Sequence, residues 1–93
     1  MNSNYIYILT NVNNSVLYVG VTSDLHQRIA QHRRGESGFT ARYNLTKLIY
    51  VEQHSDIRSA IEREKQIKSW SRRRKEELIA ESNPTWAEIM PVE

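Results

Sequence analysis

The sequence contains no cysteine. Disulfide bonds, zinc sites built on thiolates and cysteine nucleophiles are therefore excluded together, and stability has to come from the hydrophobic core. Long apolar segments are also missing, because the longest uninterrupted apolar run, Tyr5 to Leu9, is far too short to span a bilayer. The amino terminus lacks a basic lead followed by a long apolar stretch. We therefore expect a cytoplasmic protein with neither a signal peptide nor a membrane helix.

With 93 residues, the chain has room for one small domain, 1–93, and for no separate specificity domain of ordinary size. Any recognition of a substrate must therefore come from the same fold. We expect the core of the domain to span about 4–82. The segment 83–93, which carries Asn83-Pro84 and Trp86, should follow it.

The net charge of +2 is modest, but the charges are segregated along the chain. Basic residues gather between Lys65 and Lys75, and carboxylates concentrate near the carboxyl end. Such a surface suits a polyanion, but solvated helix faces have the same composition, so charge alone does not identify a nucleic-acid partner. The candidate nucleic-acid-binding residues are Lys65, Lys68, Arg72, Arg73, Arg74 and Lys75.

Aromatic and β-branched residues predict a β-hairpin at the start of the chain. Two such runs, 5–10 and 16–21, are joined by an Asn-rich segment that is typical of a turn. A third strand is predicted from about Lys47 to Gln53, after a polar segment that contains Gly35, Ser37 and Gly38.

Three helices are predicted from their caps and from the spacing of their apolar residues. The first runs from about Asp24 to Arg34 and ends at Gly35. The second follows Ser55, which is its expected cap, and the third runs from a cap at Ser71 to about residue 81.

The carboxyl-terminal segment contains a further helix signal. Thr85 to Glu88 has the spacing of a capping box, which predicts a last short turn that folds Trp86 and Ile89 back onto the domain. The order β-β-α-β-α-α favours a small α/β (α+β) domain in which a three-stranded antiparallel or mixed sheet is flanked by helices.

Glu64 lies on the apolar stripe of the second helix. On a helical wheel Ile57, Ala60, Ile61 and Ile67 share one side, and Glu64 falls near its middle. An ionised carboxylate that loses its hydration is destabilising unless a counter-charge or a metal replaces the water. The sequence therefore predicts a partner for Glu64, and a bound cation is one candidate.

Four further residues are candidates for chemistry, together with Gly20. Tyr7 and Tyr18 lie on the two arms of the predicted hairpin, where their rings can approach one site, although most strand tyrosines serve packing. Arg28 and His32 share a face of the first helix at the edge of the core, or form an exposed pair. A guanidinium matches a phosphate, and an imidazole can relay a proton. Gly20 permits a close approach or marks a strand end.

In their order and spacing, these residues resemble the GIY-YIG nuclease superfamily. The resemblance is carried by Tyr5-Ile6-Tyr7, Tyr18-Val19-Gly20, Arg28 with His32, and Glu64 followed by Ile67-Lys68. Its small stand-alone branch, the YhbQ-like or UPF0213 group, is similar through the segment from Glu64 to Trp70 and through Asn83-Pro84 with Trp86. Tyr5 stands where the first motif, GIY, has glycine, and Val19 stands where the second motif, YIG, has isoleucine.

The resemblance implies a metal-dependent endonuclease that hydrolyses DNA phosphodiester bonds, selects structure rather than sequence, and serves DNA repair or recombination. It implies that Glu64 holds one divalent cation, Mg²⁺ or Mn²⁺. Tyr7 or Tyr18 would act on the attacking water, as a phenolate stabilised by nearby cations. Arg28 would contact the scissile phosphate, and His32 would accept or relay a proton.

Two other functions stay open. A nucleic-acid-binding module would keep the fold but hydrolyse little unless a protein partner completes its site, and the small size of the chain favours this alternative. A protein-interaction domain would leave Glu64 paired with Lys68 or Arg28. By the same resemblance, Asn83 is a candidate support of the site. DNA is the expected nucleic acid, with RNA as the alternative.

Overall fold

Three strands form one antiparallel sheet in the computed structural model, which describes residues 3–90. β1 (Asn4–Thr10) lies in the centre of the sheet, between β2 (Leu17–Thr22) and β3 (Lys47–His54). Both neighbours run antiparallel to β1. The predicted hairpin and the predicted third strand are confirmed, and the two edges of the sheet are β2 and β3.

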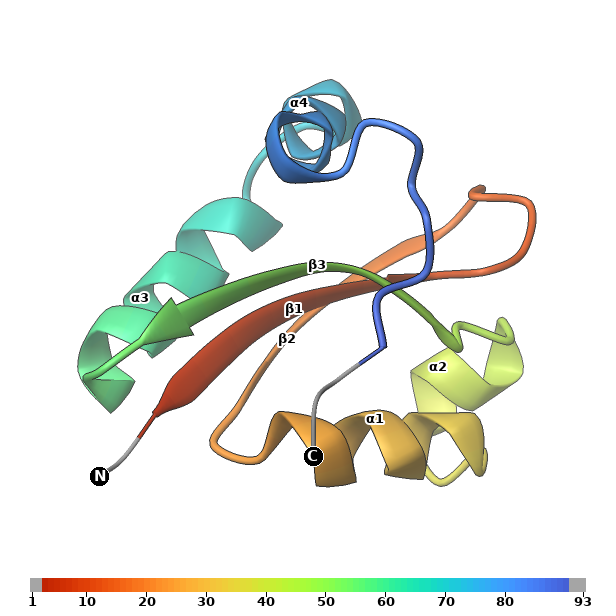
Figure 1. The fold of residues 1–93 in the computed structure, drawn as a ribbon, viewed down its shortest axis with the longest axis horizontal. Coiled ribbons are helices and arrows are strands. Elements are labelled where there is room, and N and C mark those ends of the chain that lie inside the picture. Colours follow the sequence, from red (N-terminus) through yellow and green to blue (C-terminus); the bar gives the residue numbers. More distant parts are fainter. Residues whose placement is uncertain (1–2, 91–93) are drawn as a thin grey trace.

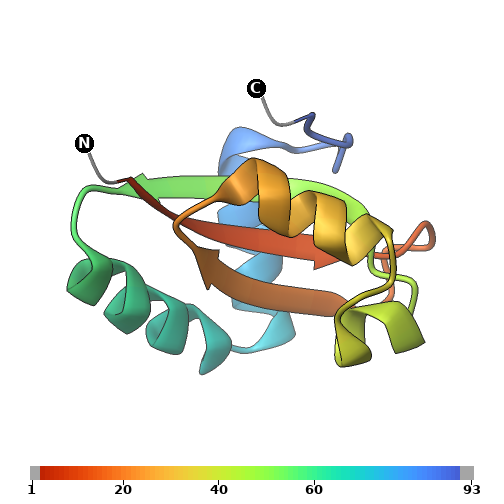
Figure 2. The same cartoon turned by 90° about the horizontal axis from the view of Figure 1, so that it is seen from below.

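The helices cover both faces of this sheet (Figures 1 and 2). α1 (Leu25–Arg33) and α2 (Gly38–Arg42) lie on one face, and α3 (Ile57–Lys68) and α4 (Arg72–Ser82) lie on the other. The predicted α+β order is confirmed, with the short helix α2 as an addition between α1 and β3.

Side chains that accept backbone N–H groups fix the helix starts. Asp24 accepts from the N–H three residues on at 3.1 Å at the start of α1, and Ser71 does the same at 3.2 Å for α4, as predicted. At α3 the prediction of Ser55 was wrong, because Asp56 is the cap, with Oδ2 3.2 Å from the nitrogen of Ser59. A carboxylate there also complements the positive end of the helix dipole.

The helix α2 occupies a segment that was expected to be a loop. Gly35 has a φ of 72° and ends α1 as predicted, because this left-handed conformation favours glycine. The chain then turns at Ser37 into five helical residues. A helix this short shows no apolar period, which is why the sequence pattern did not predict it. Thr40 is its buried residue and faces the core.

Alternation along β1 separates two hydrophobic clusters. Ile6 and Ile8 pack beneath α3 and α4, whereas Tyr7 and Leu9 pack on the α1 side. All four side chains are completely buried. The central strand is therefore buried on both faces, and each of its residues faces one of the two helical layers.

A carboxylate cluster joins β3 to α3. Glu52 accepts hydrogen bonds from the Tyr50 hydroxyl at 2.6 Å and from Nε of Arg63 at 2.9 Å, and lies 2.7 Å from Nε2 of His54. Burial by itself would raise the pKa of Glu52, but the hydrogen bonds from Arg63, Tyr50 and His54 lower that pKa to about 2. Glu52 therefore stays ionised and holds α3 against the sheet.

Residues 83–90 fold back over the sheet without forming another helix (Figure 1). Ile89 packs on the α1 side, and its N–H donates to the Leu48 carbonyl at 2.7 Å. Trp86 packs against the cluster on the opposite face. The return of both residues is confirmed, whereas the capping box is absent, since Glu88 pairs with Arg33 at 2.8 Å.

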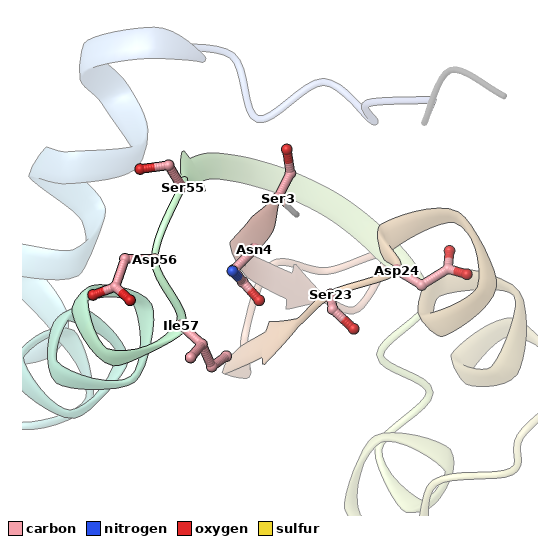
Figure 3. Close-up of a pocket in the computed structure, with 7 residues that line it drawn as sticks. All are labelled: Ser3, Asn4, Ser23, Asp24, Ser55, Asp56 and Ile57. Carbon is pink, nitrogen blue, oxygen red and sulfur yellow. The ribbon is translucent and has the colours of Figure 1, made fainter. Parts of the chain in front are cut away.

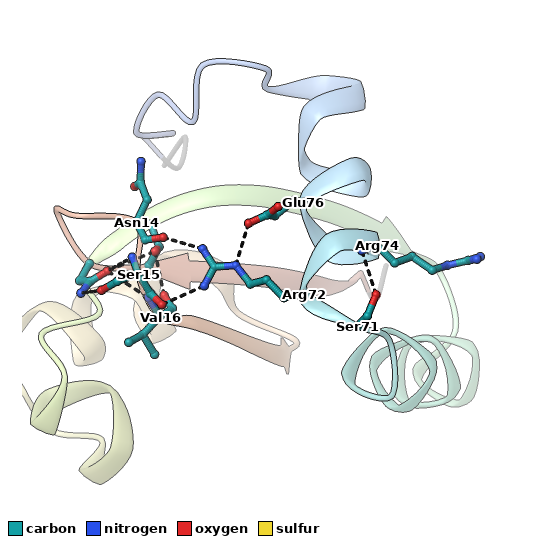
Figure 4. A network of polar contacts seen from close by, with 9 residues as sticks. Asn14, Ser15, Val16, Ser71, Arg72, Arg74 and Glu76 are labelled. Carbon is teal, nitrogen blue, oxygen red and sulfur yellow. Dashed lines mark hydrogen bonds and ion pairs between the residues drawn. The ribbon is translucent and has the colours of Figure 1, made fainter.

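Arg72, the first residue of α4, holds the turn between β1 and β2 (Figure 4). Its guanidinium donates to the carbonyl oxygens of Ser15 at 2.8 Å and Asn14 at 2.5 Å, and its Nε donates to Glu76 at 2.9 Å. The guanidinium carbon also lies 5.8 Å from the centroid of the Trp86 ring. Arg72 therefore connects three parts of the fold and has little capacity left for another partner.

Gly20 leaves the space in which the Tyr7 side chain crosses β2. The two residues face each other in the ladder between β1 and β2. A Cβ at position 20 would lie 2.5 Å from the Tyr7 hydroxyl oxygen and 2.8 Å from Cε1. The close approach that the sequence allowed is confirmed, because the Tyr7 ring fills the volume that any other residue at position 20 would need.

Gly20→Ala is expected to lower the free energy of unfolding by about 2 kcal/mol or more, because the added methyl group collides with the buried Tyr7 ring. Gly38→Ala is the matched control, since a Cβ there would meet nothing within 4 Å. Urea unfolding of both variants measures the difference. An unfolding free energy of Gly20→Ala equal to that of wild type would contradict this packing.

Arg72→Ala is expected to lower the free energy of unfolding by about 1–2 kcal/mol, because two turn carbonyls and Glu76 lose their donor. Arg73→Ala is the neighbouring control. The Arg73 side chain is 89% exposed, and its Nε lies 3.7 Å from Glu77. Its removal should change stability by less than about 0.5 kcal/mol. Equal losses in thermal or chemical unfolding would show that the Arg72 contacts contribute little.

Candidate active site

The register between β1 and β2 brings Tyr7 and Tyr18 to the same face of the sheet. Tyr18 is opposite Leu9, two residues from Tyr7, and the two tyrosine ring centroids lie 6.2 Å apart. Tyr7 is completely buried, whereas Tyr18 is half-buried on the edge strand β2. The expectation that the two rings approach one place is confirmed, with one ring inside the protein and one at its surface.

His32 is buried in α1 and hydrogen-bonded at both ring nitrogens. Nε2 lies 2.9 Å from the Tyr7 hydroxyl oxygen, and Nδ1 lies 2.7 Å from the Thr40 hydroxyl oxygen. Thr40 donates its single hydroxyl proton to the Ser37 carbonyl at 3.2 Å. Thr40 must therefore accept from the Nδ1–H, which leaves Nε2 of a neutral imidazole to accept the Tyr7 proton. His32 lies inside the core rather than at its edge.

The surroundings keep both members of this pair neutral. Burial lowers the pKa of His32 below its usual 6.5, and the charge of Arg28 lowers it further. Burial and then the neighbouring Tyr18 raise the pKa of Tyr7 far above its usual 10, while Arg28 opposes that rise. A Tyr7 phenolate, which the sequence allowed, is therefore disfavoured. Neutral Tyr7 can instead pass its proton to His32.

Arg28 is the exposed member of the group. It lies one turn before His32 on α1, and its charge acts on the pKa of both His32 and Tyr7. Together with Gln27 and Gln31 it lines a small hollow of 150 Å³. Within residues 3–90 it forms no ion pair. Its guanidinium therefore remains available to an anion.

Lys68 connects Glu64 to the Tyr18 side of this group. Its side chain is 16% exposed, and Oε2 lies 3.2 Å from Nζ of Lys68. The same Nζ lies 5.9 Å from the centroid of the Tyr18 ring. Glu64 has the counter-charge that it was expected to need. The predicted stripe is confirmed in part, since Ala60 and Ile67 are completely buried against the sheet, whereas Ile57 and Ile61 stay 47% and 37% exposed.

A divalent cation would find one carboxylate here. Glu64 is a hard, partly exposed oxygen donor, which suits Mg²⁺ or Mn²⁺ held by one carboxylate, water and a phosphate ligand. Across the described residues 3–90, no three His, Asp or Glu side chains converge on a metal position. The residues therefore fit a cation whose coordination is completed from outside the protein, and the Lys68 ammonium would have to give way to it.

Sequence reasoning missed three residues beside this group, two in α2 and the third, Tyr43, at its C-terminal cap. Thr40 fixes the tautomer of His32, as described above. The Phe39 ring centroid lies 6.0 Å from that of Tyr18, and the Tyr43 ring lies 4.9 Å from Phe39. The one signal for them was the only phenylalanine of the chain standing in a polar segment.

The predicted basic residues lie on α3 and α4 and differ in whether their side chains already contact other residues of the protein. Arg73 and Lys68 have side chains that are 89% and 49% exposed. Arg74 lies 4.3 Å from the centroid of the Trp70 ring, and Arg72 is occupied by the hairpin turn. Arg72 is therefore a structural residue. The basic side chains left to contact a polyanion are Lys65, Lys68, Arg73, Arg74 and Lys75.

Asn83 lies at the other edge of the sheet. Its Nδ2 donates to the carbonyl oxygens of Ile49 at 2.9 Å and Ala87 at 2.8 Å, and its Oδ1 accepts from the Ala87 nitrogen at 3.1 Å. Ile49 belongs to β3, which is separated from β2 and Tyr18 by β1. Asn83 thus does not join the site, and its amide instead ties the turn after α4 to the sheet.

A polar hollow of 690 Å³ opens between the starts of α1 and α3 (Figure 3). Serine hydroxyls, Asn4 and the carboxylates of Asp24 and Asp56 line it. Both carboxylates already accept backbone N–H groups from the helix starts. Neither tyrosine of the site, nor His32 or Glu64, lines this hollow, so it is separate from the candidate active site.

A family model and individual relatives place this chain in the same protein family. The model of the GIY-YIG catalytic domain matches residues 3–77. A UPF0213 protein from Natronomonas pharaonis is 35% identical over 78 residues, which cover 83% of this chain and 91% of that protein. A UPF0213 protein from Staphylococcus haemolyticus is 38% identical over 85 residues, which cover 87% of this chain and 99% of that protein.

The fold is also found in a solved structure. The solution NMR structure of a UPF0213 protein from Bacillus halodurans has a TM-score of 0.60 and 28% sequence identity, and the match covers 90% of this chain and 89% of that one. None of the helices in residues 3–90 is long and apolar enough to cross a membrane. The matched region contains the tyrosine pair, His32 and Glu64. The chain therefore belongs to the GIY-YIG family of nucleases, and within it to the UPF0213 group.

Proposed function

We propose that this protein is a metal-dependent endonuclease that hydrolyses phosphodiester bonds in DNA and selects its substrate by structure rather than by sequence. The observation that carries the proposal is the hydrogen bond between Tyr7 and a neutral His32, with the exposed Arg28 beside it. Glu64 adds a carboxylate that is paired with Lys68, whose Nζ lies 5.9 Å from the centroid of the Tyr18 ring. A role in DNA repair or recombination, with a partner protein that adds specificity, completes the proposal.

Water activation is assigned to the tyrosine pair and His32. Hydrolysis of a phosphodiester needs an activated water and stabilised charge in the transition state. Tyr18 is the tyrosine that reaches solvent, and it lies close enough to affect the pKa of Tyr7. In this assignment the water gives its proton to the Tyr18 oxygen, Tyr18 passes its own proton to Tyr7, and Tyr7 passes its proton to Nε2 of His32. As the water oxygen bonds to phosphorus, the bond from phosphorus to the leaving sugar oxygen breaks and that oxygen takes a proton from solvent, while His32 ends as an imidazolium.

Stabilisation of the negative charge on the phosphate is assigned to Arg28 and to the divalent cation that Glu64 would hold. The Arg28 guanidinium would donate to the non-bridging phosphate oxygens. A Mg²⁺ or Mn²⁺ ion bound at Glu64 would supply Lewis-acid stabilisation of the phosphate. Glu64 would hold that ion as the one protein carboxylate, and Lys68, if released from Glu64, would be free to contact a neighbouring phosphate.

The second candidate is a nucleic-acid-binding module that hydrolyses little unless a partner completes its site. The ion pair between Glu64 and Lys68 favours it, because this carboxylate already has a counter-charge within the fold. Such a module would bind nucleic acid through the exposed Lys65 and Arg73, with an affinity that falls as salt rises. It would release no product when Mg²⁺ or Mn²⁺ is added.

Glu64→Ala is expected to abolish metal-dependent cleavage of labelled single-stranded, duplex, flap and branched DNA, but to preserve DNA binding measured in chelator. The variant removes the metal ligand and leaves the basic surface unchanged. Arg28→Ala should lower the cleavage rate about 100-fold or more, because a donor to the transition state is lost. Glu62→Ala, on an exposed position of the same helix, is the control and should cleave like wild type.

Cleavage by Glu64→Ala and Arg28→Ala at the wild-type rate would reject the assigned site. DNA binding by the wild-type protein without any product, in Mg²⁺ and in Mn²⁺, would reject the enzyme and favour the binding module.

The cleavage rate is expected to fall on the acid side as His32 becomes protonated. Only neutral His32 accepts a proton, and its pKa lies below 6.5 because of burial and the charge of Arg28. The rate should therefore not depend on this group above pH 6.5 and should decline at lower pH. NMR titration of the His32 ring measures the same pKa without catalysis, and Arg28→Gln should raise it. A His32 pKa above 6.5 would contradict this assignment.

A further inference from the structure

Phe39 of α2 and Tyr43, the residue that caps α2, carry aromatic rings at the surface on the side of Tyr18. Phe39 and Tyr43 keep 49% and 41% of their surface exposed. Their ring centroids lie 4.9 Å apart, and the Phe39 ring lies 6.0 Å from that of Tyr18. Tyr18 in turn lies 6.2 Å from Tyr7. Four rings therefore form a continuous line that begins at the buried Tyr7 and ends in solvent at Tyr43.

α2 has an anchor on its inner side that does not involve these exposed rings. Thr40, on the inner side of the helix, is completely buried and anchors α2 through its 2.7 Å contact with His32. An apolar ring left half in water gains only part of the stabilisation that full burial would give. The chain has one phenylalanine and places it here rather than in the core.

The chemistry of this surface matches a nucleobase. Aromatic side chains bind bases by stacking, and every base has a face that can stack. The Arg42 guanidinium carbon lies over the Tyr43 ring, 5.7 Å from its centroid, which adds a cation to this aromatic surface that can attract a phosphate. In a duplex, neighbouring base pairs cover both faces of each base. Only an unpaired nucleotide can therefore stack on Phe39 or Tyr43.

We propose that Phe39 and Tyr43 bind unpaired nucleobases beside the scissile phosphate, so that the substrate of this protein is single-stranded DNA. This inference rests on the proposed nuclease function, because the line of rings begins at the tyrosine pair assigned to the attacking water. It specifies the substrate class of that same site. α2 and its cap thus have two faces. Thr40 on the inner face holds His32, and the exposed rings of Phe39 and Tyr43 select single-stranded DNA.

The test measures binding rather than cleavage. Dissociation constants of a fluorescent oligothymidine and of a blunt-ended duplex of two complementary strands, each of that same length, are measured by anisotropy in chelator. Phe39→Ala and Tyr43→Ala should each weaken binding of the single strand about tenfold and leave duplex binding unchanged. Phe39→Tyr and Tyr43→Phe keep a ring and should keep the wild-type affinity, whereas Phe39→Leu keeps apolar volume without the flat ring and should bind like Phe39→Ala.

Ile57→Ala is the matched control. Ile57 is 47% exposed and begins α3, at the end of the sheet away from α2 in Figure 1. Loss of this exposed apolar side chain should leave the affinity for the single strand unchanged. Thermal unfolding of every variant shows whether it is folded, which is expected because the substituted side chains are exposed.

Three results would overturn the inference: unchanged single-strand affinity in folded Phe39→Ala and Tyr43→Ala, equal losses on single strand and duplex, or wild-type binding that is tighter to the duplex. These results are distinct from failure of the proposed function. Absence of cleavage with Mg²⁺ or Mn²⁺ would reject the nuclease assignment, whereas the binding comparison needs no catalysis and would still decide whether α2 selects unpaired DNA.

Discussion

The hydrogen bond between the Tyr7 hydroxyl and Nε2 of His32 is the contact on which the arrangement of the site depends. It joins the central strand to α1 inside the core, and it exists only because Gly20 leaves room for the Tyr7 ring. Thr40 then directs the proton of His32 to Nδ1. A buried polar pair is stable when every donor has an acceptor, and here α2 supplies the last acceptor. The chemistry and the packing of this domain therefore use the same contacts.

Charged groups are arranged outside this neutral pair. Arg28 lies exposed on α1, and Glu64 with Lys68 lies on α3 beside Tyr18. Arg28 stays in contact with solvent and Glu64 has a counter-charge in Lys68, which limits the cost of desolvating them, while the neutral proton acceptor is shielded from water. This separation gives the edge strand β2 its special position, because Tyr18 is the residue at which the buried and the exposed groups meet. On the opposite edge, Asn83 donates a hydrogen bond to the backbone of β3, and this contact stabilises the fold.

Much of the site could be predicted from the sequence because its signals are local. Period-2 strands, the caps Asp24 and Ser71 and the stop at Gly35 all depend on neighbouring residues. Glu64 stood out because its position contradicted the pattern around it. Predictions failed where two local options compete or where no pattern exists. Asp56 rather than Ser55 caps α3, and five residues of α2 are too few to show a period.

By itself the sequence determined the strands, the long helices and the identity of the groups that can carry charge or protons, since these follow from side-chain chemistry and short-range spacing. Only the tertiary structure decided their states and their roles. Burial makes Tyr7 and His32 neutral, the contact with the hairpin turn makes Arg72 structural, and the placement of α2 beside Tyr18 makes Phe39 part of the site. The physical reason is that desolvation and long-range contacts depend on residues far apart in the chain, which no local pattern records.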